Sequence, residues 1–222
     1  MVGDTNLKKI PGWITNIILL SPLVYFFNAC MPWFMGTWHD HHTNFLSTFG
    51  SILILHWIFV LFILYTLKRR QIPVSTIGYT LNKRKTISYL SIYFLVALVL
   101  IINRFYISHT AATLYGQVLT KTEMVFWVFA SLSAGVCEEL IFRGYGINIL
   151  TANGWNKWIA AIVTSILFCC IHQPILLMGF GYMLYYTSFG LVMAVIYLST
   201  GKLWIPMALH MGFDLLLLLS FS

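Results

Sequence analysis

Residues 124–150 read MVFWVFASLSAGVCEELIFRGYGINIL, an apolar run interrupted by two adjacent glutamates, Glu138 and Glu139, and by Arg143. As one helix, this run is long enough to cross a bilayer core of about 30 Å. Ionisable residues are costly inside a membrane span, so they usually face a polar interior between helices. The run therefore predicts a membrane-spanning helix that contributes to a buried polar site.

The rest of the chain has the composition of a membrane protein. Of its 222 residues, 59% are hydrophobic and 9% are charged. Apolar stretches predict seven spans, give or take one, at roughly 12–31, 45–67, 86–103, 123–150, 157–173, 175–198 and 203–221. We therefore expect an all-α fold, a polytopic transmembrane helical bundle of about seven (six to eight) spans, built as a single membrane domain over residues 1–222.

The formal net charge of +7 follows the pattern of a membrane topology signal. Lysines and arginines gather in short segments between alternate spans, as the positive-inside rule describes for cytoplasmic loops. The pattern predicts a multi-pass protein of the plasma membrane with its N-terminus in the cytoplasm. No soluble segment is long enough to carry a continuous basic surface, so the charge does not indicate binding to nucleic acid.

Three more ionisable residues lie in two of the later apolar stretches: His172 in 157–173, and His210 and Asp214 in 203–221. At about 1.5 Å per residue, Glu138 lies roughly 18 Å from the cytoplasmic end of its span, His172 roughly 21 Å and Asp214 roughly 16 Å. Similar depth on three helices indicates one shared polar pocket near the middle of the membrane.

Helical spacing gives a partner to one of the two glutamates. Glu139 and Arg143 are four residues apart on one face, so this pair can neutralise the charge and fix the register of the helix. Glu138 points about 100° away and has no cation within one turn. A desolvated glutamate of this kind can act as a general base on water, and His172 could share the proton or polarise the same water.

The remaining polar and aromatic residues have plainer interpretations. His210 and Asp214 are four residues apart, so Asp214 can orient His210 or hydrogen-bond a ligand beside it. Phe168, one turn before His172, is interpreted as a packing residue. His56, in the predicted span 45–67, is interpreted as a helix–helix hydrogen-bonding residue.

Metal binding is the main alternative to glutamate chemistry. A glutamate and two histidines resemble the ligand set of catalytic zinc. We favour a site with no metal and no other cofactor, because no HExxH pair places two ligands on one helix. The run His39-Asp40-His41-His42 is a weaker metal candidate, since it lacks a defined ligand geometry.

Three motifs follow one another along the predicted spans: Glu138-Glu139-x-x-x-Arg143, Phe168-x-x-x-His172 and His210-x-x-x-Asp214. Together they resemble the signature of the CAAX-protease and bacteriocin-processing family (CPBP, or Abi) of intramembrane endopeptidases. The resemblance covers roughly residues 120–220, the expected catalytic core, and the first hundred residues are compatible with it.

The resemblance implies a membrane protease, similar to type II CAAX prenyl endopeptidases, with a cavity open to the cytoplasm. Glu138 would activate water with His172, and His210 with its neighbour at 214 would stabilise the oxyanion. Members that process prenylated proteins usually carry Asn where this chain has Asp214, and an ionised Asp cannot donate a hydrogen bond. The implied catalytic residues are Glu138, His172, His210 and Asp214, and the implied supporting residues are Glu139, Arg143 and Phe168.

We therefore expect an intramembrane endopeptidase that hydrolyses a peptide bond of a membrane-associated, lipidated or leader-bearing peptide. Its partners would be that substrate and the lipid bilayer, with no nucleic acid and no required cofactor. The alternatives are a non-catalytic membrane scaffold or bacteriocin-immunity protein of the same fold, a zinc-dependent form of the protease, and a small transporter that relays protons.

Overall fold

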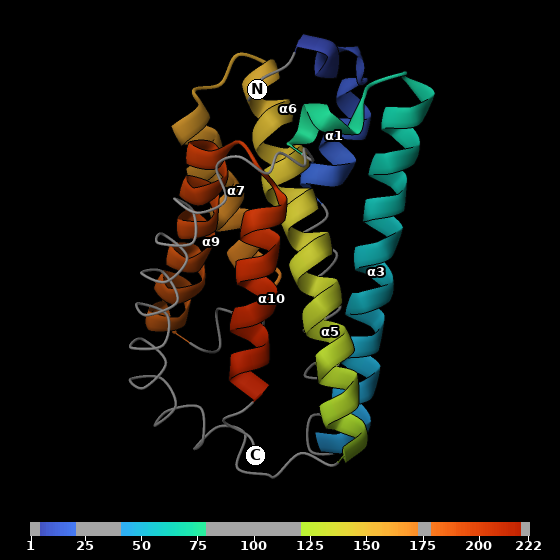
Figure 1. Ribbon diagram of the computed structural model, residues 1–222, viewed down its shortest axis with the longest axis vertical. Helices are drawn as coiled ribbons and strands as arrows, with labels where there is room; N and C mark the ends of the chain where they lie inside the picture. The colour runs from blue at the N-terminus through green and yellow to red at the C-terminus, as the bar shows by residue number, and fades with distance from the viewer. Residues whose placement is uncertain (1–4, 21–40, 79–120, 173–178, 219–222) are drawn as a thin grey trace.

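The computed structural model describes residues 5–20, 41–78, 121–172 and 179–218. Within these ranges every regular element is helical, which confirms the predicted all-α class. Figure 1 shows the long helices running side by side along one axis. In chain order the elements are η1 (Thr5–Lys9), α1 (Gly12–Leu19), α3 (His41–Arg69), η2 (Val74–Ile77), α5 (Lys121–Glu139), the π-helix η4 (Leu140–Ile147), α6 (Asn148–Ala152), α7 (Lys157–Cys170), α9 (Phe180–Thr200) and α10 (Trp204–Leu218).

Several helices agree with predicted spans. Among the described residues, two helices are long and apolar enough to cross a membrane, Met124–Ala152 and Phe180–Thr200, and Lys157–Cys170 is a shorter apolar helix. The predicted span 86–103 and the second half of the predicted span 12–31 lie outside the described residues. The count of seven spans therefore stays a prediction.

The continuous helical unit α5–η4–α6 forms the centre of the bundle. α5 packs against α10 and α3, and η4 packs against α7. At Gly135 the helices approach very closely, because a Cβ atom there would lie 2.9 Å from the backbone nitrogen of Met211 on α10. Small residues at helix interfaces allow this kind of backbone approach in membrane proteins.

Helix α3 has one face buried inside the bundle and an opposite face on the outer surface. Its buried face carries His56, Val60, Ile63 and Leu67, spaced by three or four residues as one helical stripe requires. Large apolar side chains cover the opposite face: Ile54, Trp57, Ile58, Leu61 and Tyr65 are all exposed. An apolar outer surface of this extent suits contact with lipid.

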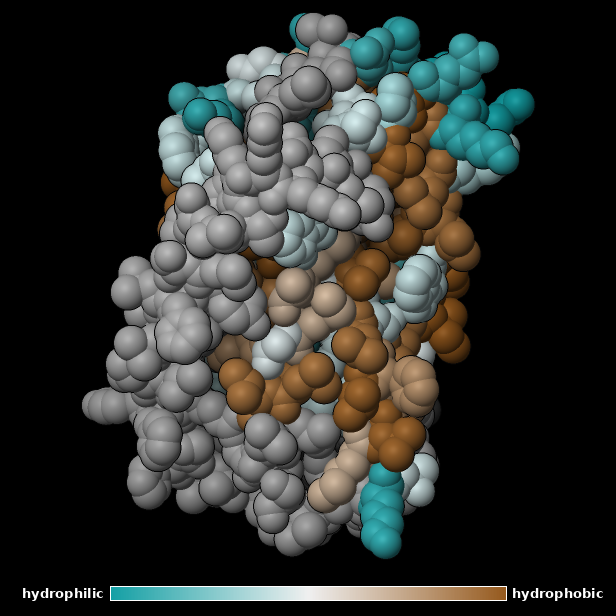
Figure 2. Space-filling view, in the orientation of Figure 1, coloured by the Kyte–Doolittle hydropathy of each residue, from teal (hydrophilic) through white to brown (hydrophobic). Residues whose placement is uncertain are grey.

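Basic residues collect at one end of this apolar surface. Figure 2 shows hydrophilic residues gathered where η1 and the last turn of α3 lie, with hydrophobic residues over the middle of the visible face. The last turns of these two elements carry Lys8 and Lys9, and Lys68 and Arg69. The predicted N-terminal orientation rests on this clustering of positive charge.

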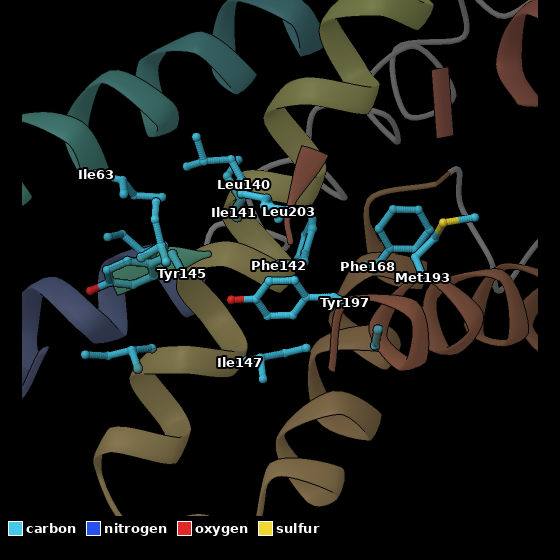
Figure 3. Close-up of a cluster of buried hydrophobic side chains, with 14 of the residues drawn as sticks. Ile63, Leu140, Ile141, Phe142, Tyr145, Ile147, Phe168, Met193, Tyr197 and Leu203 are labelled. Carbon is cyan, nitrogen blue, oxygen red and sulfur yellow. The ribbon is translucent and has the colours of Figure 1, made fainter. Parts of the chain in front are cut away.

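The middle of the predicted span 123–150 differs from the regular α-helix that the hydropathy predicts. Residues Leu140–Ile147 form a π-helix, η4, in which all eight residues are buried. Asn148 stabilises its end: the side-chain Nδ2 donates to the carbonyl oxygen of Gly144 at 2.6 Å and to the hydroxyl of Tyr197 at 2.5 Å. Figure 3 shows side chains of η4, Tyr145 and Ile147 among them, within the apolar core beside Tyr197. π-helical turns within α-helices are frequent at functional sites.

Candidate active site

The carboxylate of Glu138 lies among three imidazole rings at the end of α5. Its Oε1 atom is 3.2 Å from Nε2 of His56 on α3. Its Oε2 atom is 3.6 Å from Nε2 of His172 and 3.8 Å from Nε2 of His210 on α10. Glu138 is only 4% exposed, so the cluster lies inside the bundle. The structure thus brings together Glu138, His172 and His210 from three separate parts of the chain.

Glu139 has a separate set of partners. Its Oε1 atom accepts a hydrogen bond from Arg143 Nη1 at 2.7 Å and is 2.9 Å from Nδ1 of His210. Glu139 and Arg143 are both 0% exposed, so each charge depends on the other for compensation. The predicted pair is therefore present, and Glu139 also links α5 to α10 through His210.

Arg143 extends this network to α7 and α9. Its Nη2 donates to the carbonyl oxygen of Gly190 on α9 at 2.9 Å. Its guanidinium carbon lies 4.4 Å from the centre of the Phe168 ring on α7, a cation–π contact. Phe168 is fully buried and also contacts the rings of His172 and His210, at 4.4 Å and 5.7 Å between centroids. Phe168 therefore packs as predicted, and the groups it packs against are the polar groups of the site.

His172 lies in the turn directly after α7, just beyond the end of the helix at Cys170. Its Nδ1 is 2.9 Å from the carbonyl oxygen of Phe168. A carbonyl oxygen can only accept, so Nδ1 carries the proton in this hydrogen bond. In the neutral ring Nε2 is then an acceptor, and it faces the acceptor Oε2 of Glu138. Two acceptors 3.6 Å apart cannot bond to each other, but both can accept protons from one water molecule.

Asp214 approaches His210 without forming a short hydrogen bond. Asp214 Oδ2 is 3.7 Å from Nε2 of His210, within ion-pair distance but longer than a hydrogen bond. The side chains of Asp214 and His172 are each 21% exposed, whereas those of His56 and His210 are 2% exposed. The accessible edge of the cluster therefore lies on the side of His172 and Asp214.

The carboxylate and imidazole groups of this cluster are of the kind that bind metal ions. The ligand atoms of Glu138, His172 and His210 lie within 4.8 Å of one another, and the Nδ1 atoms of both histidines already face acceptors, as in many zinc sites. Zinc bonds of about 2.0–2.1 Å would place tetrahedral ligands roughly 3.3–3.4 Å apart. The two distances from Glu138 Oε2, 3.6 and 3.8 Å, are wider, so the side chains would have to close around zinc. A water molecule that donates two hydrogen bonds of about 2.8 Å would place its acceptors roughly 4.5 Å apart, so the observed spacing lies between the two cases.

The structure adds one residue, His56, that the sequence interpretation had treated only as a helix–helix hydrogen-bonding residue. His56 is 1% exposed and contacts Glu138 more closely than His172 or His210 does. Its position among isoleucines and leucines, with no acidic residue nearby in sequence, gave no local signal of this contact. The other predicted metal candidate, the run at 39–42, lies outside the residues whose side chains the structure describes.

Comparison with known proteins finds one family model that matches part of the second half of the chain. Residues 120–216 match the family model described as "Type II CAAX prenyl endopeptidase Rce1-like". The chain is also similar to an "Uncharacterized 24.3 kDa protein" of Escherichia coli, 30% identical over 94 residues, which are 40% of this chain and 39% of that protein. The chain thus matches well under two thirds of the length of that relative. No solved structure matches it.

Proposed function

We propose that this chain, whose residues 120–216 form an Rce1-like domain of the type II CAAX prenyl endopeptidase family, is an intramembrane endopeptidase that uses glutamate-activated water. The supporting observation is the arrangement around Glu138. One carboxylate oxygen faces the Nε2 atoms of both His172 and His210, at 3.6 and 3.8 Å. We propose that a water molecule enters beside this oxygen, where a base and two imidazoles converge.

In the first step, the water donates hydrogen bonds to Glu138 Oε2 and to His172 Nε2. Glu138 Oε2 takes one proton while the water oxygen attacks the carbonyl carbon of the scissile peptide bond. The π electrons of that carbonyl move to its oxygen, which becomes the oxyanion of a tetrahedral intermediate. His172 keeps the attacking oxygen in line, because its own Nδ1–H is held by the carbonyl oxygen of Phe168.

His210 is the proposed electrophile. An Nε2–H on this ring donates to the developing oxyanion while Nδ1–H remains directed at Glu139 Oε1, 2.9 Å away. The carboxylates of Glu139 and Asp214 flank the ring and offset the positive charge of the imidazolium that this role requires. The intermediate then collapses: the carbon–nitrogen bond breaks, the proton on Glu138 Oε2 passes to the leaving amine, and the carboxylate is restored.

The proposed substrate is a membrane-associated, lipidated or leader-bearing peptide. The site is buried in a bundle with an apolar outer surface, and its more accessible edge lies beside His172 and Asp214. A peptide already held at the bilayer can therefore approach without leaving the membrane. We propose that Glu138 and the two histidines carry out this hydrolysis without a metal or an organic cofactor.

The test is a cleavage assay with the purified full chain in lipid nanodiscs. A panel of membrane-anchored, prenylated and leader-bearing peptides is incubated in isotopically heavy water, and products are read by mass spectrometry. We expect one peptide to be cut with one heavy oxygen in its new carboxyl group, and Glu138→Gln to abolish this product. Normal cleavage by Glu138→Gln would reject the mechanism, and no cleavage of any peptide would favour the scaffold or immunity alternative.

A chelator series tests the zinc alternative in the same assay. A metal-chelating phenanthroline is compared with its non-chelating isomer, so that effects of the aromatic compound itself are subtracted. The glutamate mechanism predicts equal activity with both compounds. Loss of cleavage with the chelating isomer alone, restored by added zinc, would replace it with metal-assisted hydrolysis.

A further inference from the structure

We propose that His56 is a positioning residue for Glu138: it donates a hydrogen bond from Nε2 to Oε1 and so reserves Oε2 for the reacting water. The catalytic part of this inference rests on the proposed function. The hydrogen bond itself does not, and it can be tested separately. His56 belongs to α3 and lies outside the family-matched residues 120–216, so the N-terminal part of the chain completes the site.

The contact between His56 and Glu138 is geometrically distinct from the other two imidazole contacts. Nε2 of His56 is 3.2 Å from Oε1, which is at the outer limit of an ordinary hydrogen bond. The corresponding distances from Oε2 to His172 and His210 are 3.6 and 3.8 Å, which are too long. The two carboxylate oxygens therefore differ: Oε1 lies nearest to the His56 imidazole, and Oε2 faces the imidazoles of His172 and His210.

Position on α3 explains how the histidine reaches this carboxylate. His56 continues the buried stripe formed by Val60, Ile63 and Leu67, which packs toward α5 and η4. Glu138 is in the last turn of α5, just before the π-helix that begins at Leu140. Both side chains are almost fully buried, so the donor and the acceptor meet away from bulk water, where an ionised carboxylate needs a partner.

A fixed donor on one oxygen determines where the proton goes. The terminal torsion of a glutamate is broad and nearly two-fold, so a free carboxylate presents either oxygen. With Oε1 accepting from His56, the proton taken from water resides on Oε2, and Oε1 becomes the carbonyl oxygen of the acid. The hydrogen bond persists but loses the assistance of charge, which favours return of the proton to the leaving amine.

The alternative is that His56 serves only to join α3 to α5. Joining two helices needs a polar contact of some kind, whereas positioning needs a donor at the location of Nε2. Glutamine and asparagine separate these roles, because the Gln amide nitrogen can reach the location of Nε2 and the shorter Asn cannot. Thr66, buried on the same helix, provides a matched control as Thr66→Val.

The kinetic experiment compares His56→Gln, His56→Asn and Thr66→Val with the wild type, using whichever peptide the wild type cleaves. We expect His56→Asn to lower kcat about a hundredfold with KM changed less than about threefold. His56→Gln should recover most of that loss, and Thr66→Val should match the wild type. Equal kcat losses in Gln and Asn variants, or full activity in His56→Asn, would overturn the proposal.

A second measurement addresses the hydrogen bond without turnover. Nitrogen NMR of histidine-labelled protein in nanodiscs reports which ring nitrogen of His56 carries the proton, with signals assigned by their absence in His56→Asn. We expect the Nε2–H form in the wild type and a mixture of forms in Glu138→Ala. An unchanged spectrum in Glu138→Ala would refute the His56 contact. If no peptide is cleaved but the spectrum responds as expected, the protease assignment fails and the contact stands.

Discussion

Glu138 and Glu139 are neighbours in sequence, yet their partners separate a chemical role from a structural one. Glu139 is bonded to Arg143 and His210 at 2.7 and 2.9 Å, distances that leave no room for water between the charges. Glu138 keeps one oxygen without a hydrogen-bond partner among the described residues. A buried carboxylate oxygen that faces two imidazoles without accepting a direct hydrogen bond is suited to receive a proton.

This division predicts opposite behaviour for two matched substitutions. Glu138→Gln should lower kcat by about a hundredfold to ten-thousandfold while the protein keeps its melting temperature. Glu139→Gln should instead lower the free energy of unfolding by about 3–5 kcal/mol, because it leaves the buried guanidinium of Arg143 without its counter-charge. Thermal melts in nanodiscs, run beside the cleavage assay, check both. A stable, fully active Glu139→Gln would show that the pair is dispensable.

Asp214 provides a second prediction for a single residue. Its carboxylate is 3.7 Å from His210 Nε2, so it acts on that ring through charge rather than through a short hydrogen bond. An amide of the same size can donate to an oxyanion, which an ionised carboxylate cannot. We therefore expect Asp214→Asn to retain kcat within about tenfold, and Asp214→Leu to lose about a hundredfold. A loss as large in Asn as in Leu would mean that the carboxylate charge itself is required.

At the scale of the elements, the site depends on how closely α10 approaches α5. Gly135 lies one turn before Glu138, and Met211 lies next to His210, so this close approach of the two helices sets the spacing between Glu138 and His210. A Cβ atom at Gly135 would meet the Met211 backbone nitrogen at 2.9 Å and the Met207 carbonyl oxygen at 3.2 Å. Backbone atoms cannot rotate away as a side chain can, so the helices must separate.

Gly135→Ala should therefore reduce activity more than its single methyl group would suggest. We expect kcat to fall about tenfold or more, since displacements of about 1 Å at a reacting centre can cost a hundredfold. Gly181→Ala in α9 is the matched control, because a Cβ there meets no described atom within 4 Å. Cleavage rates and melting temperatures of both variants test the idea. Equal effects of the two substitutions would argue against spacing control by this contact.

Much of this arrangement was predictable from the sequence, and the reasons differ between elements. Hydropathy located α3, α9 and α10 closely, because a span must match the thickness of the bilayer. Spacing found the Glu139–Arg143 pair, since residues four apart meet on one helix face. The π-helix η4 could not be inferred, because it depends on tertiary contacts such as Asn148 with Tyr197. His56 could not be inferred either, because its partner lies 82 positions along the chain (138 minus 56).

For the whole molecule, the direction of the helices gives the bundle two distinct ends. In Figure 1, η1 and the end of α3 lie at one end, and the last described turn of α10 lies at the other. The first of these ends carries Lys8, Lys9, Lys68 and Arg69, whereas α10 has no basic residue in its last turn. An asymmetry of this sort sets the orientation of membrane proteins during insertion.

We therefore expect the N-terminus in the cytoplasm and the C-terminus on the opposite side of the plasma membrane. A fluorescent protein that matures only in the cytoplasm should report at the N-terminus, and alkaline phosphatase, active only outside, should report at the C-terminus. Replacing Lys68, Arg69 and Arg70 with glutamine removes a large share of the positive charge at that end, so it should produce a fraction of inverted molecules. Phosphatase activity at the N-terminus of the unmodified protein would reverse the orientation, and with it the side from which a peptide must reach Glu138.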